Sequence, residues 1–327
     1  MKLSIVILCW NDLKVIGNCL QSIYATTHSI EFEVIVSDNG SIDGSVEFIR
    51  RYFPQVQVIE NGTNLRFSKG NNVGIRASHG EYVLILNPDT VIHEGSLDRW
   101  IEFADRHPEA GGFGCRVLNL DGSYQGPARP FPSIRRDLIA AFYLRPLAFI
   151  SEFFVSDTYT GWNGNTERKV DWQSGCCVMF RGELLKRLGG FDEQFFYHYE
   201  EVDLCQRVWN SGYPIIYTPE SIITHLGGQS TMHAPLAFEV DKYRNQYLYF
   251  YKYYGRRGVR GCRFVVLTRL IIRHLGYGLV QLAKPNNRRA QRLALYRAAI
   301  KWNRRVDPVR YVEEGLDPGT ELSVAVH

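Results

Sequence analysis

The sequence lacks several patterns that would each have assigned it to a known class. The first apolar stretch runs into Cys9-Trp10-Asn11-Asp12 without the Gly-x-Gly-x-x-Gly of a nicotinamide-binding turn, which argues against a dehydrogenase. None of the seven cysteines has Cys-x-x-Cys spacing, so neither a zinc site nor a redox pair is expected. The cysteine number is odd, and Cys9 and Cys205 stand in apolar patterns. Both features indicate buried free thiols in a reducing compartment.

Long uninterrupted apolar runs are also missing. The nearest candidate, residues 262–282, is interrupted by Arg263, Arg269, Arg273 and His274. We therefore expect no membrane-spanning helix. The first residues lack the apolar core and cleavage site of a signal peptide, which predicts a cytoplasmic protein. Internal repeats and low-complexity tracts are absent as well.

Acidic residues are nearly absent from the C-terminal part of the chain. Eighteen Lys and Arg lie between Asp241 and Arg310 against two acids, whereas acids outnumber bases in the rest of the sequence. Such a basic, aromatic-rich segment suits an anionic membrane surface. Nucleic acid is the rival partner, but no nucleic-acid-binding motif is present, and a helical appendage with a solvated basic face is the plain alternative. The membrane hypothesis predicts that Glu at positions 256, 257 and 260 would release the protein from anionic vesicles.

Strands and helices alternate over the first hundred residues. Continuous apolar runs predict buried strands at 3–9, 32–37, 56–60 and 82–86. Helical spacing predicts the intervening helices at 15–25, 44–53, 69–78 and 95–106. This alternation predicts an α/β fold with a doubly wound, mostly parallel central sheet. Ligands of such sheets bind at the carboxyl ends of the strands.

The pattern changes after residue 111. Strands are predicted at 112–118 and 174–180, helices at 182–188 and 201–210, and extended segments at 215–217 and 221–224. Between the two strands lies a long segment rich in Pro, Gly and aromatic residues, 122–172, which we expect to be functional or mobile. After residue 235 the chain is predicted to be mostly helical.

Acidic side chains directly follow two of the predicted strands. Asp38 could accept hydrogen bonds from a nucleobase or a ribose, or it could cap the next helix. Asn87-Pro88-Asp89 follows the strand at 82–86. Asp89 could hold Mg²⁺ or Mn²⁺ and so neutralise a diphosphate leaving group, or it could cap the helix after a proline turn. The residues alone leave both alternatives open.

Further acids and a histidine stand in the second half. Glu200, Glu201 and Asp203 begin a helix within one turn, and such crowding raises at least one pKa, which suits a general base. A solvated acidic helix start is the commoner outcome for a charge run. His225 follows a short strand and could complete a metal shell, or it could be an ordinary loop histidine.

Two weaker signals concern a helix start and an indole. Lys69-Gly70-Asn71 begins a predicted helix, whose first amides together with a lysine can bind phosphate. Trp172 precedes Gly175 at a strand start. An indole there could stack on the apolar face of a sugar or pack in the core.

Eight segments combine these features in one order along the chain: 4–7, 38–45, 70–75, 86–90, 172–175, 189–193, 200–207 and 225–228. The combination resembles glycosyltransferase family 2, in its bacterial rhamnosyltransferase-like branch, over residues 2–254. The resemblance implies a GT-A fold in residues 1–235, with a nucleotide-sugar half (1–118) and an acceptor half (119–235), followed by a helical segment, 236–327.

The resemblance implies a nucleoside diphosphate sugar donor, dTDP- or UDP-linked, and a divalent cation, Mn²⁺ or Mg²⁺. The donor would be bound by Asn11, Asp38, Asn39, Lys69, Asn71, Asn87 and Asp89. Residues 87–89 would replace the family's Asp-x-Asp motif, with Asn in place of the first Asp, so that Asp89 binds the metal and His225 approaches it. Trp172 and Gly175 would contact the acceptor.

The catalytic base of the family is the acid of a Glu-Asp pair, which falls here on Glu201, with Glu200 and Asp203 as substitutes. Glu stands where Asp is usual, and the extra methylene moves the carboxylate. Asp203 could instead orient the acceptor or brace the helix. The base would deprotonate an acceptor hydroxyl, whose oxygen attacks the anomeric carbon opposite the diphosphate and inverts its configuration.

The acceptor implied by the resemblance is a saccharide, either lipid-linked or part of a surface-polysaccharide precursor. Peripheral attachment at the inner face of the membrane would follow. The branch suggests dTDP-rhamnose, although neighbouring members use other donors. A processive synthase would need several spanning helices and a Gln-x-x-Arg-Trp motif, which are missing. A catalytically inactive, membrane-docked nucleotide-sugar-binding protein stays open, because Asn87 and Glu201 depart from the family pattern.

Overall fold

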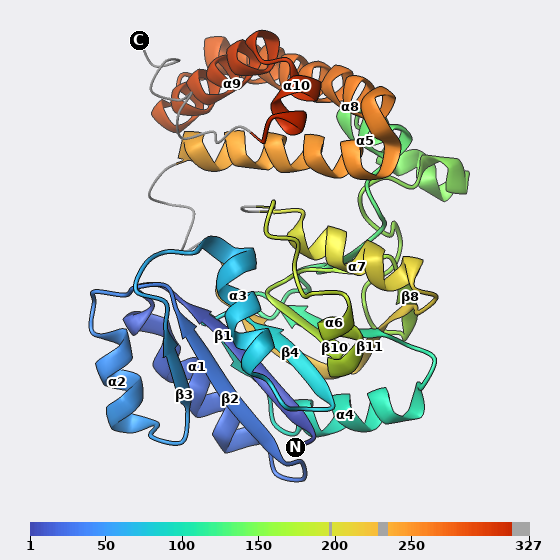
Figure 1. The fold of residues 1–327 in the computed structure, drawn as a ribbon. Coiled ribbons are helices and arrows are strands. Elements are labelled where there is room, and N and C mark those ends of the chain that lie inside the picture. The colour runs from blue at the N-terminus through green and yellow to red at the C-terminus, as the bar shows by residue number, and fades with distance from the viewer. Residues whose placement is uncertain (196–197, 228–234, 316–327) are drawn as a thin grey trace. The chain divides into compact units, whose positions relative to one another are not determined.

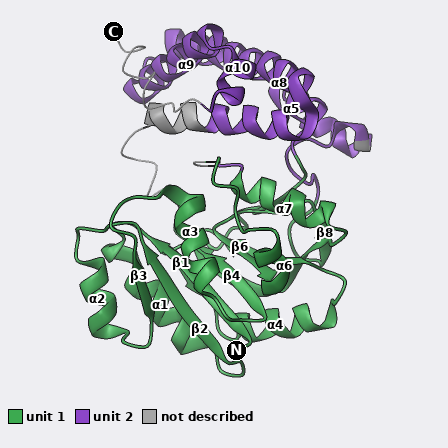
Figure 2. Cartoon of the chain, viewed as in Figure 1, with its two compact units in different colours: residues 1–131, 162–196, 200–229 green, residues 132–161, 197–199, 230–327 purple. Residues whose placement is uncertain are grey.

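The computed structural model describes residues 1–195, 198–227 and 235–315 (Figure 1). The chain forms two compact units (Figure 2). The sheet unit comprises residues 1–131, 162–196 and 200–229, and the helical unit comprises residues 132–161, 197–199 and 230–327. The sequence predicts a single division near residue 235. The observed division differs because the helical unit also contains two earlier segments of the chain.

A nine-stranded sheet forms the centre of the sheet unit, with the order β3-β2-β1-β4-β10-β6-β11-β5 and β8 also paired with β11. The strands of the unit are β1 (Leu3–Cys9), β2 (Phe32–Asp38), β3 (Gln57–Glu60), β4 (Tyr82–Leu86), β5 (Thr90–Ile92), β6 (Gly112–Leu118), β7 (Ala128–Arg129), β8 (Arg168–Val170), β9 (Trp172–Gln173), β10 (Cys177–Arg181) and β11 (Ile215–His225). β1 to β4 pair in parallel, and β10 runs antiparallel to β4 and β6. β7 and β9 form a separate pair. The predicted, mostly parallel sheet is confirmed.

Helices cover both faces of this sheet (Figure 1). They are α1 (Leu13–Thr26), α2 (Ser45–Tyr52), α3 (Arg66–Ala77), α4 (Ser96–Arg106), α6 (Gly182–Arg187) and α7 (Glu200–Asn210). Ile5 and Ile7 of β1 share a buried core with α1 and α4, whereas Val6 faces α3. A Cβ at Gly74 of α3 would stand 2.4 Å from the Val6 side chain, so helix and strand touch through a glycine. Burial on both faces explains the continuous apolar runs.

Some boundaries differ from the predicted ones. The segments predicted at 215–217 and 221–224 are one strand, β11, whose pairing with β6 shifts between Thr218 and Ile222. Pro219 lies within that irregularity, because proline cannot donate to the ladder. The short strand β5 was not predicted, since three residues carry too little pattern. α3 begins at Arg66 rather than residue 69.

The helical unit contains α5 (Ile134–Ala141), the 3₁₀ turns η1 (Arg145–Phe149) and η2 (Glu152–Phe154), α8 (Pro235–Ala283), α9 (Asn287–Arg305) and α10 (Pro308–Glu313). Gly255 breaks α8 with a φ of 63°. Asn286 caps α9 by accepting from the amides of Arg288 and Arg289. The segment predicted as a long loop, 122–172, thus includes α5 and two 3₁₀ turns.

One described helical stretch, residues 242–283 of α8, is long and apolar enough to cross a membrane by length and composition. The sequence predicts no spanning helix here, because several cations interrupt the apolar run. Within its most apolar window 17% is buried, although other residues of α8, such as Val259, Cys262 and Val266, are fully buried. Length and composition do not distinguish a spanning helix from one that lies on a surface.

Candidate active site

The carboxyl ends of β1, β2 and β4 lie together at one edge of the sheet. Cys9 pairs with Asp38 at the end of the β1–β2 ladder, and Leu86 ends β4 beside Ile7. The turns that follow these strands interlock: the Asn11 amide donates to Ser41 Oγ at 2.8 Å, and Asn11 Oδ1 accepts from the Ile42 amide at 2.9 Å. The sheet topology therefore brings polar turns from distant parts of the sequence into one place.

Asp38 serves its own turn with only one carboxylate oxygen. Asp38 Oδ2 accepts from the amides of Gly40 and Ser41, each at 2.9 Å. Asp38 Oδ1 is buried and has no hydrogen-bond partner among the described residues. A buried acceptor without a partner costs about 1–3 kcal/mol. One oxygen thus fulfils the turn role, and the other makes no hydrogen bond within the described residues.

The neighbouring amide residues differ in their availability. Asn39 is engaged within the protein, because its side chain donates to Asn64 Oδ1 and the Arg66 carbonyl and accepts from Asn61. Asn71 donates to the Phe67 carbonyl, while its Oδ1 is buried without a partner among the described residues.

Lys69 is exposed on α3. Since α3 begins one turn earlier than predicted, Lys69 and Asn71 do not start the helix. The predicted start at residue 69 is therefore corrected to Arg66, and Lys69, as the fourth residue of the helix, still lies among the first four amides.

Asp89 and His225 face each other across the β5–β11 pair. His225 pairs with Thr90 in the ladder, and the Leu226 amide donates to the Asp89 carbonyl at 2.9 Å. His225 Nε2 lies 3.2 Å from Asp89 Oδ1, and His225 Nδ1 lies 2.9 Å from Gln125 Oε1. The contact with Gln125 fixes the imidazole plane, so that Nε2 is the nitrogen directed at the acid.

Several acids lie near Asp89 at this edge of the sheet. Burial first, and then the charges of Asp89, Asp43 and Asp38, raise the pKa of Asp12 to about 6, against the hydrogen bond from the Trp10 amide. A cation would relieve this crowding of acids. Within the described residues no group of three or more His, Cys, Asp and Glu side chains could hold an ion by itself. Such a partial set suits Mg²⁺ or Mn²⁺, which take remaining ligands from substrate phosphates and water.

Glu201 lies in the first turn of α7, beside the loop that precedes β10. Burial raises the pKa of Glu201, while hydrogen bonds from backbone amides, including that of Gly175, and the Arg129 guanidinium act in the opposite direction. Glu201 Oε2 is buried without a hydrogen-bond partner in the described part of the chain. A carboxylate with a raised pKa and an unused oxygen is suited to accept a proton.

One loop, residues 174–176, links Glu201 to the Asp89 turn. The Asn87 amide donates to the Cys176 carbonyl at 2.9 Å, and the Gly175 amide contacts the Glu201 carboxylate. Burial above all, with smaller contributions from nearby charges that include Asp89 and Glu201, raises the pKa of the Cys176 thiol to about 12. The turn after β4 and Glu201 of α7 thus both contact this loop.

The two other acids of α7 face away from Glu201. Glu200 and Asp203 are three residues apart, which places them on one helix face, and both are buried. Asp203 Oδ2 accepts from Arg207 Nε at 2.8 Å, and Arg207 also donates to the carbonyls of Leu188 and Gly190. This arrangement is the brace that the sequence left open as an alternative role for Asp203.

Trp172 is half-buried on β9, opposite Arg129 of β7. Its Nε1 donates to the Pro130 carbonyl at 3.0 Å, and the Arg129 guanidinium lies 5.9 Å from its ring centroid. A Cβ at Gly175 would meet Phe67 at 3.4 Å and Glu201 Cβ at 3.6 Å, so the loop approaches α7 closely at this glycine.

Three residues of the site were not predicted. Asp12 directly follows Asn11 after β1, so its position in the sequence could have identified it. Arg129 and Gln125 lie in the Pro-rich and Gly-rich segment, where no periodicity reveals which side chains point to the sheet edge.

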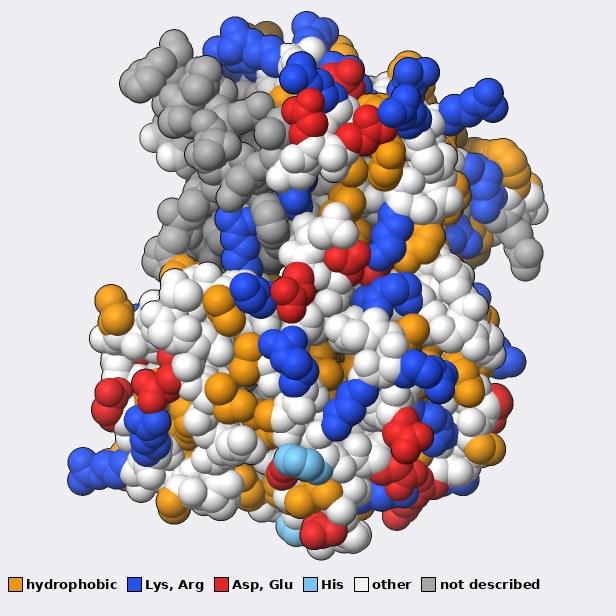
Figure 3. All heavy atoms as spheres, viewed as in Figure 1, with side chains coloured by type: hydrophobic (Ala, Val, Ile, Leu, Met, Phe, Trp, Pro, Cys, Tyr) orange, Lys and Arg blue, Asp and Glu red, His pale blue; other side chains and the backbone are white. Residues whose placement is uncertain are grey.

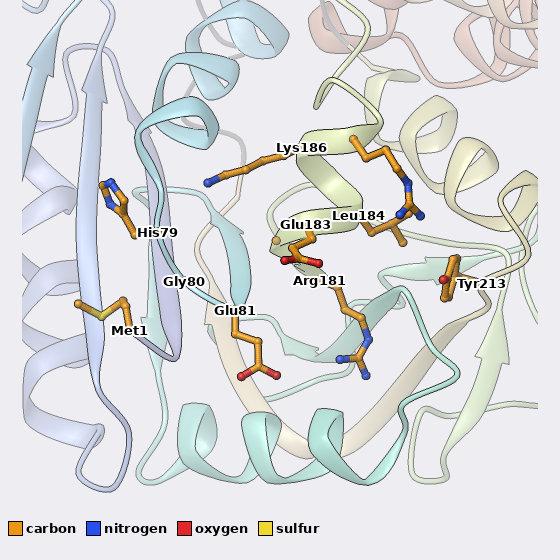
Figure 4. Close-up of a pocket in the computed structure, with 11 residues that line it drawn as sticks. Met1, His79, Gly80, Glu81, Arg181, Glu183, Leu184, Lys186 and Tyr213 are labelled. Carbon is orange, nitrogen blue, oxygen red and sulfur yellow. The ribbon is translucent and has the colours of Figure 1, made fainter.

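A separate cavity of about 700 Å³ lies at the opposite edge of the sheet (Figure 4). Its lining includes Met1, Glu81, Arg181 and Lys186, which precede β1 and β4 or follow the antiparallel β10. Arg181 is held by the carbonyls of Ala104, His107 and Ala110. Since ligands of doubly wound sheets bind at the carboxyl ends of the strands, this cavity is not the candidate active site.

The chain resembles known proteins in sequence. An N-acetylglucosaminyl-diphospho-decaprenol L-rhamnosyltransferase of Mycobacterium tuberculosis (strain ATCC 25618 / H37Rv) is 29% identical over 233 residues, covering 66% of this chain and 73% of that protein. The rhamnosyltransferase WbbL of Escherichia coli (strain K12) is 26% identical over 198 residues, covering 58% of this chain and 70% of that protein.

Solved structures share the fold. The mannosyltransferase PcManGT from Pyrobaculum calidifontis, in complex with GDP-Man and Mn²⁺, superposes with a TM-score of 0.54 at 16% identity, covering 99% of this chain and 86% of that one. S. aureus TarS 1–349 in complex with UDP-GlcNAc gives a TM-score of 0.53 at 17% identity, covering 96% and 88%. The chain has a GT-A sheet, and rhamnosyltransferases are among its relatives. Residues 4–189 match the family described as glycosyl transferase family 2, and the chain belongs to that family.

Proposed function

We propose that this protein is an inverting, metal-dependent glycosyltransferase that moves a sugar from a nucleoside diphosphate onto a saccharide acceptor. The observation that carries the proposal is the arrangement of two groups about the 174–176 loop. Asp89 with His225 lies toward one side of that loop, and Glu201 contacts it from α7. A cation-binding acid and a proton-accepting acid are the two groups that a direct displacement needs.

The donor would be held at the carboxyl edge of the sheet. Asp38 Oδ1 and Asn71 Oδ1, both buried without partners among the described residues, would accept hydrogen bonds from the nucleobase or ribose. Asn11, Asn39 and Asn87 would shape the pocket from the turns around them, and exposed Lys69 would contact phosphate. Asp89 and His225 would hold a divalent cation, which neutralises charge on the departing diphosphate.

The acceptor would be deprotonated by Glu201. Its Oε2 takes the proton of an acceptor hydroxyl, and the hydroxyl oxygen forms a bond to the anomeric carbon. The bond between that carbon and the diphosphate oxygen breaks on the opposite face, so the anomeric configuration inverts. Trp172 and Gly175 would contact the acceptor beside the base. Glu200 and Asp203 are substitutes for the base, although Asp203 is already paired with Arg207.

The names of the relatives suggest the substrates. The Mycobacterium tuberculosis relative is named for rhamnosyl transfer to a decaprenol-linked acceptor, and two solved structures contain UDP-GlcNAc and GDP-Man. We propose a rhamnosyl donor, dTDP-linked as in the branch it resembles, and a lipid-linked saccharide acceptor at the inner face of the membrane.

The test is a transfer assay with dTDP-rhamnose, UDP-GlcNAc and GDP-mannose, each with a lipid-linked saccharide. We expect one donor to support transfer, loss of transfer on chelation, recovery with Mn²⁺ or Mg²⁺, and inverted anomeric configuration by NMR. Glu201→Gln should reduce kcat by roughly 10²–10⁴-fold, the usual contribution of a general base. Donor binding without transfer would favour the inactive nucleotide-sugar-binding protein instead, and retained configuration would refute the single displacement.

A further inference from the structure

We propose that the helical unit carries a binding site for the phosphate of an anionic membrane lipid, in a groove between α8 and α9. The groove has a volume of about 510 Å³ and is lined by Ile271, His274, Leu275, Arg297, Ile300, Lys301, Arg304 and Arg305. The inference goes beyond the proposed sugar transfer and does not depend on it.

Two contacts hold α8 and α9 antiparallel on either side of the groove. At one end Arg263 of α8 donates to the carbonyls of Asn303 and Arg304 of α9, each at 3.0 Å. At the other end the rings of Tyr277 and Tyr296 meet edge to face, with centroids 5.6 Å apart. All the lining residues belong to α8 or α9, and most of them lie between these two contacts, so the groove belongs to a fixed helix pair rather than to a loop.

The charge of the groove has a single sign. Arg297, Lys301 and Arg304 repeat at helical spacing on one face of α9, and all three are exposed. No acid lines the groove, and none occurs between residues 242 and 306. Like charges at this spacing destabilise a helix. An anion bound between these cations would relieve their repulsion, so the row is complementary to an anion.

An unused polar atom lies in the same groove. His274 Nδ1 is buried and has no hydrogen-bond partner among the described residues. A buried nitrogen without a partner costs free energy unless a ligand satisfies it. Because an imidazole Nδ1 that carries a hydrogen can donate it, His274 could bind a phosphate oxygen together with the cations of α9.

An apolar stripe on α8 leads into the groove and identifies the ligand as a lipid. Phe264, Leu275, Leu279 and Leu282 repeat at helical spacing and expose 64%, 60%, 69% and 83% of their surface, respectively. Large exposed apolar side chains that share one helix face mark an interaction surface. Lys and Arg side chains gather over the helical unit, with hydrophobic side chains exposed between them (Figure 3). Free phosphate offers nothing to such a stripe, whereas a phospholipid supplies both the anion and the hydrocarbon.

The site differs from the one that the sequence suggested. Arg256, one of three arginines expected to contact the membrane, is paired with Glu313 through a contact of 2.8 Å. Arg257 and Arg260 are exposed, but they do not line the groove. Substitution of Arg257 and Arg260, which lie outside the groove, therefore serves as a control for substitution of the groove cations.

The experiment measures binding of the full chain to vesicles of phosphatidylcholine alone and of phosphatidylcholine with phosphatidylglycerol. The groove variant combines Arg297→Gln, Lys301→Gln and Arg304→Gln, and the control combines Arg257→Gln, Arg260→Gln and Arg288→Gln. Both lose three positive charges from the helical unit. We expect the groove variant to bind anionic vesicles about 100-fold more weakly, since each cation near such a surface contributes about five-fold, and the control to lose less than about five-fold.

Additional arms separate the sources of phosphate and the class of partner. Inorganic phosphate at the concentration of the vesicle phosphate should not displace the protein from vesicles, and displacement would assign the groove to a free anion. Equal losses of vesicle affinity in both variants would refute the lipid-phosphate groove. A loss of affinity for single-stranded RNA in the groove variant alone would also refute it, because the partner would then be a nucleic acid. Sugar transfer to a soluble saccharide should be unchanged in the groove variant. Vesicle binding is measured without sugar transfer, so it tests the groove even if the protein has no transferase activity.

Discussion

At the scale of single residues, the chemistry depends on how the surroundings set the proton affinity of Glu201. Burial raises its pKa, and the Arg129 guanidinium together with nearby amides holds that rise back. A base must be ionised to act, so the acid limb of the rate profile should follow this pKa, above the ordinary value of 4.5.

Replacement of Arg129 tests this balance. In Arg129→Gln the carboxylate loses a nearby positive charge, so its pKa rises and it stays protonated to higher pH. The acid limb of kcat/KM against pH should move to higher pH. Arg129→Lys, which keeps the charge, should leave the acid limb close to its position in the unsubstituted protein. Arg50→Gln, which removes an exposed partner of Glu60, serves as the control and should leave the limb unchanged. An unmoved limb in Arg129→Gln would remove Glu201 from the role of base.

The Asp89–His225 pair makes a second prediction at this scale. Asp89→Asn and His225→Gln should each weaken the apparent affinity for Mn²⁺ by roughly 100-fold in the presence of a nucleoside diphosphate, because each removes a ligand. Thermal shift against Mn²⁺ concentration measures this affinity, since bound ligand stabilises the folded protein by mass action.

The control for that experiment uses another histidine–acid pair. His28 Nε2 lies 2.7 Å from Glu94 Oε1 on the surface, with 57% and 75% of the side chains exposed. His28→Gln and Glu94→Gln should leave the Mn²⁺ response as it is. Loss of the response in these variants, or its survival in Asp89→Asn, would contradict the assignment of the cation site.

At the scale of elements, α7 separates three neighbouring acids by its geometry. Glu201 points to the 174–176 loop, while Glu200 and Asp203 share the buried face. The sequence predicts an acidic helix start. It does not predict which acid is directed at the 174–176 loop, because that depends on which face of α7 packs against the rest of the sheet unit.

Asp203→Asn distinguishes a brace from a base. The substitution leaves Arg207, only 18% exposed, without its carboxylate, and breaking a buried pair costs roughly 3 kcal/mol. We expect the midpoint of urea unfolding to fall markedly, while kcat measured on the folded enzyme stays within a few-fold. Glu201→Gln should show the reverse pattern, a large loss of kcat with stability kept or raised, because an amide is cheaper to bury than a carboxylate. A loss of kcat in Asp203→Asn as large as that in Glu201→Gln would make Asp203 catalytic.

Sequence and structure agree best where patterns are long. The parallel strands β1, β2 and β4 and the turns after them could be predicted, because buried strands read as continuous apolar runs. β5 could not, although its pairing with β11 brings Asp89 and His225 together. Contacts between residues 89 and 225 depend on strand order, which local periodicity does not contain.

At the scale of the whole molecule, the chain comprises two compact units. The proposed transfer chemistry belongs to the sheet unit, and the proposed lipid-phosphate groove belongs to the helical unit. Proteins of this kind commonly unfold in more than one step. Tryptophan offers a way to tell the steps apart, because five of the six lie in the sheet unit and only Trp302 lies in the helical unit.

Two glycine substitutions should therefore act on different steps. A Cβ at Gly70 of α3 would stand 2.4 Å from Leu8 and 2.9 Å from Asn39, so Gly70→Ala should destabilise the sheet unit by about 1–3 kcal/mol. Gly276 of α8 has nothing within 4 Å of such an atom, so Gly276→Ala should stabilise the helical unit by about 0.5–1 kcal/mol. Urea unfolding followed by tryptophan fluorescence should report mainly the Gly70 effect, and far-UV circular dichroism should report both. A single transition that both variants move, seen equally by the two probes, would mean that the units unfold as one.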